Sequence, residues 1–66
     1  MSEAVKLIVD TYVSLKNREG LEAIREHRQR MRDQLREKSG GAFDVSKSIR
    51  TCDDEIAIVE QGLDRL

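Results

Sequence analysis

The chain has 66 residues, of which 38% are charged and 38% hydrophobic, with a formal net charge of −1 and no proline. This length allows one domain, residues 1–66, and excludes a TIM barrel or a Rossmann domain. One cysteine cannot pair within its own chain, so a disulfide scaffold is excluded as well. A composition rich in Ala, Glu, Lys, Leu and Arg favours long helices, and we predict an all-α fold.

The first helix-forming segment, residues 2–39, carries two apolar stripes with the 3–4 spacing of an amphipathic helix. The upstream stripe consists of Val5, Ile8, Tyr12 and Leu15. The downstream stripe consists of Leu21, Ile24, Arg28, Met31 and Leu35. The two stripes point roughly 150° apart around a continuous helix, so a single partner helix cannot cover both.

Two adjacent glycines, Gly40 and Gly41, predict a turn over residues 40–43 after this segment. Asp44 or Ser46 is suited to cap the helix that follows, which we expect over residues 44–66. A heptad seam, typical of a coiled coil, runs along the whole of that second helix. Its members are Val45, Ile49, Cys52, Ile56, Val59, Leu63 and Leu66.

These elements are compatible with two architectures. In the first, which we predict, one long helix over residues 2–39, with a possible kink near Asn17–Gly20, forms an antiparallel hairpin with residues 44–66. The segment 2–16 then overhangs the hairpin and exposes its apolar stripe. In the alternative, the chain breaks at residues 17–20, Gly20 ends a first helix in the left-handed conformation, and residues 3–16 fold back to make a three-helix bundle.

A basic stretch over residues 25–38 suggests nucleic-acid binding as an alternative function. Its candidate phosphate contacts are Arg25, Arg30, Arg32 and Arg36. Residues 51–66 are acidic, however, and an antiparallel hairpin places the two charged segments side by side. We expect them to neutralise each other. We also expect Arg28, the charged member of its stripe, to pair with a carboxylate across the hairpin, with Glu55 nearest and Asp53 or Glu60 as alternatives.

The sequence offers no pattern typical of catalysis or of a cofactor site. His27 has no second ligand at helical spacing, so no metal site is expected. Cys52 lies on the apolar seam, where burial and the neighbouring acidic residues would raise the pKa of its thiol. We therefore predict a non-enzymatic protein that has no cofactor, no metal and no small-molecule substrate.

The remaining prediction concerns partners and location. No apolar run approaches the roughly 20 residues that a membrane span requires, and a lone cysteine suits a reducing compartment, so we expect a cytoplasmic protein that does not bind membranes. The uncovered stripe predicts a protein partner or a second copy, as in a homodimer. Its contact residues would be Val5, Ile8, Tyr12 and Leu15. Binding to nucleic acid would weaken steeply with salt, whereas apolar packing would not.

Overall fold

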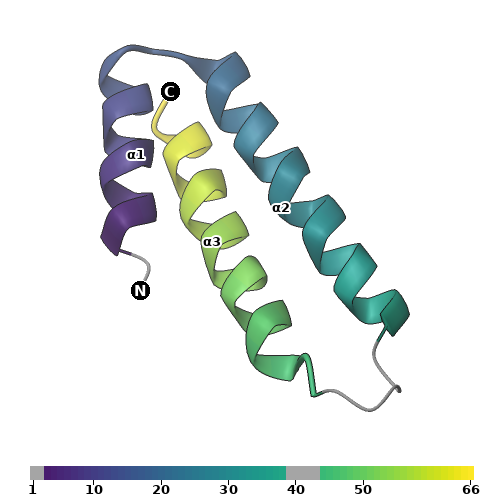
Figure 1. The fold of residues 1–66 in the computed structure, drawn as a ribbon. Coiled ribbons are helices and arrows are strands. Elements are labelled where there is room, and N and C mark those ends of the chain that lie inside the picture. Colours follow the sequence, from purple (N-terminus) through teal and green to yellow (C-terminus); the bar gives the residue numbers. More distant parts are fainter. Residues whose placement is uncertain (1–2, 39–43) are drawn as a thin grey trace.

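The computed structural model describes residues 3–38 and 44–66, which form three helices: α1 (Glu3–Ser14), α2 (Arg18–Lys38) and α3 (Ser46–Asp64). In Figure 1, α3 lies between the other two helices and packs against both. The molecule is elongated and flat, with extents of 42 × 20 × 14 Å. The fold is therefore all-α, as expected from the composition.

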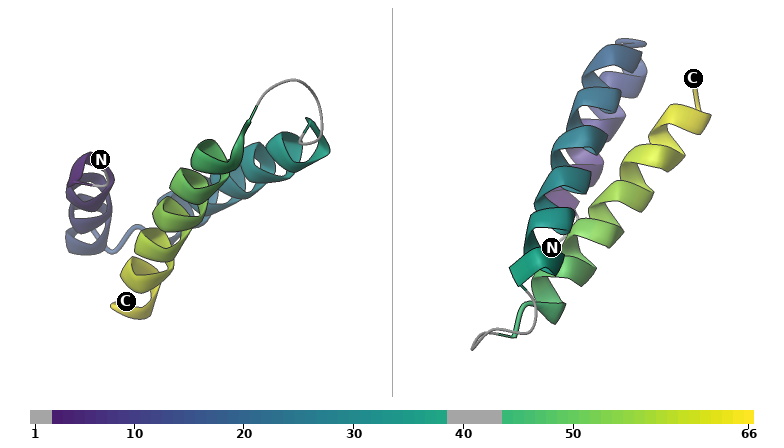
Figure 2. Two further views of the ribbon diagram at one scale, coloured as in Figure 1. Left: turned by 90° about the horizontal axis from the view of Figure 1, so that it is seen from below. Right: turned by 90° about the vertical axis from the view of Figure 1, so that its right-hand side faces the viewer.

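The prediction of one long first helix, and with it the two-helix hairpin, is wrong. The chain breaks after Ser14, and α1 folds back along α3 as the three-helix alternative requires (Figures 1 and 2). The break falls at Leu15–Asn17, slightly before the 17–20 interval of that alternative. The left-handed residue is Lys16, with φ of 54°, and not Gly20.

Backbone hydrogen bonds explain why the first helix stops there. The N–H of Asn17 donates to the carbonyl of Tyr12 at 2.8 Å, and the N–H of Lys16 donates to that of Val13 at 3.0 Å. This pair of bonds is the Schellman motif, in which the last helical carbonyls receive donors from a left-handed turn. Lysine occupies the position where glycine is favoured, at a cost of about 1–2 kcal/mol for the left-handed conformation.

The same short turn also starts the second helix. Asn17 is the cap of α2, because its Oδ1 accepts the N–H of Gly20 at 2.9 Å. Asparagine is one of the preferred capping residues, and it satisfies a backbone donor that would otherwise lack a partner. Gly20 lies inside the first turn of α2, so its role is not to end α1.

The helices α2 and α3 form the antiparallel pair that the heptad seam predicts. Cys52, Ile56, Val59 and Leu63 are buried, whereas Leu66 at the end of the seam is exposed. At the other end, the carboxylate of Asp44 accepts both the N–H and the hydroxyl of Ser46, which lowers its pKa. The N-cap position of α3 is Val45, which makes no side-chain capping bond, so the predicted cap by Asp44 or Ser46 is wrong. Asp44 instead forms a turn just before the helix and satisfies its first N–H. The predicted turn over residues 40–43 lies outside the described residues.

The apolar core lies where all three helices meet. Its buried members are Val5, Val9, Leu21, Val59 and Leu63. At 1.5 Å per residue, α1 is about 18 Å long and α2 about 31 Å long, so α1 covers only part of the pair (Figure 1). We call residues 3–27 and 56–64 the three-helix end, and residues 28–38 and 46–55 the two-helix end.

Candidate interaction surface

One side of α1 presents apolar side chains to solvent. Leu7, Ile8 and Leu15 are 69%, 48% and 68% exposed. Ala4 and Thr11 lie among them and are also exposed, and the Thr11 hydroxyl donates to the Leu7 carbonyl at 2.9 Å. Because this bond occupies the hydroxyl, the threonine adds a methyl group rather than a free donor. We call these five residues the outer face; none of them carries a charge.

The opposite side of α1 holds the helix in place. Val5 and Val9 are only 8% and 2% exposed, and Tyr12 and Val13 pack against the same core. A helix that is apolar on two sides needs two surfaces to cover it. The fold of the single chain supplies one of them, and the outer face remains in contact with solvent.

Gly62 on α3 determines how closely α1 approaches. A Cβ atom at this position would overlap Cγ1 of Val9 and would lie 3.4 Å from Cγ2 of Val13. Gly62 is buried, and any larger residue would push α1 outward. The position of α1, and hence of the outer face, thus depends on one glycine.

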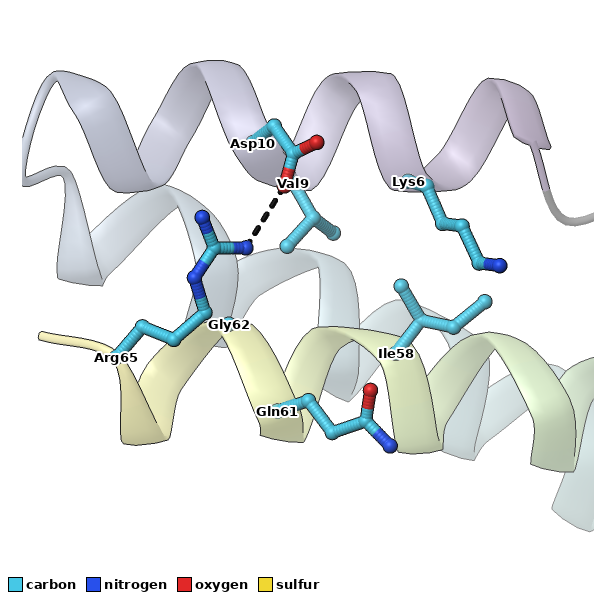
Figure 3. A pocket seen from close by; sticks show the side chains of 7 residues that line it. All are labelled: Lys6, Val9, Asp10, Ile58, Gln61, Gly62 and Arg65. Carbon is cyan, nitrogen blue, oxygen red and sulfur yellow. Dashed lines mark hydrogen bonds and ion pairs between the residues drawn. The ribbon is translucent and has the colours of Figure 1, made fainter.

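A groove of about 170 Å³ runs beside this contact, between α1 and α3 (Figure 3). Within it, Nη1 of Arg65 donates to Oδ1 of Asp10 at 2.7 Å, which links the end of α3 to α1. Both side chains are more than half exposed, so this ion pair contributes little to stability compared with the apolar contacts. The groove is smaller than the roughly 300 Å³ typical of small-molecule sites.

The four partner-binding residues predicted from the sequence divide between the two sides of α1. Val5 belongs to the buried core, and Tyr12 packs against it. Ile8 and Leu15 belong to the outer face. The predicted stripe therefore runs obliquely across the helix, and only half of it is available to a partner.

Sequence reasoning missed three residues that define this surface. Val9 is almost fully buried although it lies outside the predicted stripe, and Leu7 is the most exposed large apolar residue of α1. The spacing of Val5, Val9 and Tyr12 was a signal for the inner side, but it competes with the equally regular predicted stripe. The close approach at Gly62 could not be predicted from the sequence, because a glycine near the end of a helical pattern is also typical of a helix terminus.

The basic stretch is partly neutralised by α3, as predicted. Nε of Arg28 lies 3.0 Å from Oε1 of Glu55, which confirms the predicted pair, although the N–H is not aligned for a hydrogen bond. Arg32 also pairs across the helices, with Nη1 3.2 Å from Oδ1 of Asp53, and this contact raises its pKa. Among the other proposed phosphate contacts, Arg30 is exposed and Arg25 is half-buried.

Arg36, the last of these candidates, is exposed. The two other residues considered as candidate sites are His27 and Cys52. Nδ1 of His27 accepts a hydrogen bond of 2.7 Å from Arg28. Burial raises the pKa of the Cys52 thiol, and the carboxylate of Glu55 raises it further. Within residues 3–38 and 44–66, no three His, Cys, Asp or Glu side chains form a group that could hold a metal ion.

Comparisons with known proteins found no relative of this chain. No protein-family model matches the chain, and neither the curated proteins nor the solved structures contain a match. None of the three described helices has the length and apolar character needed to cross a membrane.

Proposed function

We propose that this chain is a small, non-enzymatic protein-interaction module that binds through the outer face of α1. The observation that carries the proposal is the presence of three large, exposed aliphatic side chains, Leu7 and Ile8 on α1 and Leu15 directly after it. Complete burial of such a side chain contributes about 1.5–3 kcal/mol. A partner that covers all three therefore gains a substantial part of the free energy of a specific complex.

The chemistry of the outer face favours an apolar helical partner. The face has no charged side chain, and Thr11 directs its hydroxyl to the backbone of its own helix. Amphipathic helices bind surfaces of this kind through side chains at spacings of three and four residues. We expect self-association, in the form of a homodimer, to be the interaction that this surface supports. A cytoplasmic location would suit a chain whose one cysteine is a buried free thiol.

Nucleic-acid binding is a weaker alternative. Arg32 is paired with Asp53, and the neighbouring Arg28 is paired with Glu55. Cations that are already paired release fewer counterions on binding phosphate, so the remaining electrostatic gain is small. The described residues therefore support an apolar interaction better than one with phosphates.

The test uses the double variant Leu7→Glu/Leu15→Glu, which places two charges on the outer face. Both positions are exposed, so the variant should keep its helical circular-dichroism spectrum. The matched control is Ser48→Glu/Ala57→Glu, which adds the same charge at exposed positions of α3. Sedimentation velocity should show a concentration-dependent mass for the wild type and the control, and a monomer for the double variant.

Two results would contradict the proposal. The first is a wild type that stays monomeric from low micromolar to near-millimolar concentration. The second is a double variant that associates as strongly as the control, because the outer face would then be irrelevant to assembly. An association that resists added salt would separate apolar packing from contacts made by the arginines.

A further inference from the structure

We infer that the outer face binds the outer face of a second copy in antiparallel orientation, about a two-fold axis between Ile8 and Thr11. This inference rests on the proposed function and adds the occupant, its direction and its register. Ala4, Ile8, Thr11 and Leu15 are spaced by four, three and four residues, which is the spacing of a two-stranded coiled-coil seam. Leu7 flanks this seam.

The sizes of the seam residues favour the antiparallel direction. In this register Ala4 packs against Leu15 of the second copy, and Ile8 packs against Thr11 of the second copy. Each pair of facing residues, which forms one layer of the interface, thus combines a smaller side chain with a larger one, so the layers have similar volumes. A parallel pair would place Leu15 against Leu15 and Ala4 against Ala4, which leaves unfilled space at the alanine layer that close packing does not tolerate.

Charges at the ends of α1 favour the same direction. Glu3 begins the helix, whereas Lys16 and Arg18 follow its end, and all three are exposed. The antiparallel register brings the acidic start of α1 in each copy to the same level along the axis as the basic segment that follows α1 in the other, at both ends of the interface. It also sets the two helix dipoles in opposition, whereas a parallel pair would align them and place like charges at the same level.

The position of α1 in the fold leaves room for a second copy. In the left view of Figure 2, α1 stands at the edge of the molecule, with α2 and α3 together on one side of it. The core residues of α1 face those helices, and the outer face is exposed. Met31, which is also exposed, lies on α2 at the two-helix end and is not part of the outer face.

The register can be tested by disulfide cross-linking of two single variants, Ala4→Cys and Leu15→Cys. Both positions are exposed, so the substitutions should not disturb the fold. In the antiparallel dimer, each new cysteine lies about 16 Å along the helix axis from its own copy in the partner chain. A disulfide requires Cα atoms within about 7 Å, so neither variant should cross-link alone. An oxidised mixture of the two should form the mixed dimer, which mass spectrometry distinguishes by its mass.

The outcomes separate this inference from the proposed function. Cross-links in the mixture alone support the antiparallel register. Cross-links within each variant alone overturn the register but leave the outer face as the interface. An absence of cross-links above the wild-type blank, together with a monomeric mass, overturns both. The wild type is a suitable blank because Cys52 is buried, with 4% exposure.

Discussion

The two ends of the molecule are held together by different interactions. At the three-helix end, Leu21 and Val59 are completely buried among apolar side chains of three helices. At the two-helix end, Leu35 and Ile49 remain half-buried, and two ion pairs between α2 and α3 lie along the seam. Where α1 adds a third helix, the seam becomes a closed apolar core. Where α1 is missing, charged side chains complete the contact.

The comparison shows what α1 contributes. Two helices can bury only a narrow seam between them, so the flanks of that seam stay accessible to water. The long stems of Arg28 and Arg32 cover part of this boundary while their charged groups reach Glu55 and Asp53. We therefore expect the three-helix end to provide most of the stability, and α1 to act both as part of the core and as the support of the outer face.

The largest expected effect comes from truncating the core at its most buried position. Leu21→Ala should lower the free energy of unfolding by about 2–5 kcal/mol, because Leu21 is 0% exposed and contacts both other helices. Leu35→Ala, the matched change at the half-buried two-helix end, should cost clearly less. Urea unfolding measures both variants. Equal losses would show that the two ends do not differ in stability.

A second prediction concerns the close contact between α1 and α3. Gly62→Ala should destabilise the fold by about 1–3 kcal/mol, because the added methyl group overlaps Val9. Val9→Ala removes the overlapping atom, so the double variant should lose less stability than the sum of the two single losses. Urea midpoints for the two single variants and the double variant provide the measurement. Additive losses would mean that the two residues are not in contact.

The ion pairs at the two-helix end should have a smaller effect. Arg28→Glu should cost about 1–2 kcal/mol, because it places two carboxylates together at a partly buried site. Adding Glu55→Arg reverses the pair and should restore part of the loss. Arg30→Glu is the control, since Arg30 is exposed and such substitutions usually stay within about 0.5 kcal/mol. If thermal unfolding shows similar losses of stability for Arg28→Glu and Arg30→Glu, the Arg28–Glu55 ion pair does not stabilise the fold.

The smallest predicted effect is a gain in stability at the turn between α1 and α2. Lys16→Gly should raise the free energy of unfolding by about 0.5–1 kcal/mol, because glycine adopts the left-handed conformation freely but also loses more entropy on folding. Lys16→Ala keeps the unfavourable conformation and should give no gain. If both variants lower the free energy of unfolding in urea, the left-handed conformation of Lys16 does not reduce the stability of the wild type.

Sequence patterns predicted the α2–α3 pair well because its seam is unambiguous. The seven seam positions alternate spacings of four and three throughout, and the antiparallel register placed Glu55 nearest to Arg28. The first segment was harder, because Lys16, Arg18 and Glu19 all favour helix and no proline forces an end. Its break depends on a capping side chain, Asn17, and on a lysine in a conformation that usually selects glycine.

The candidate surface could be predicted only in part for a related reason. In α1, apolar residues occupy two sides of the helix, so the predicted stripe and the inner side overlap at Val5 and Tyr12. Propensity and spacing cannot choose between two stripes of equal regularity. The choice depends on α3, where Gly62 allows Val9 to approach, and this is a tertiary contact that leaves no local pattern.

The central claim is that the three-helix end associates through α1, and it is tested most directly by NMR during dilution of the wild type. Amide and methyl signals of the outer face, especially Leu7, Ile8 and Leu15, should shift with concentration. Signals of Met31 and Leu35 at the two-helix end should stay constant. Shifts confined to the two-helix end, or no shift at any residue over the whole concentration range, would contradict this account.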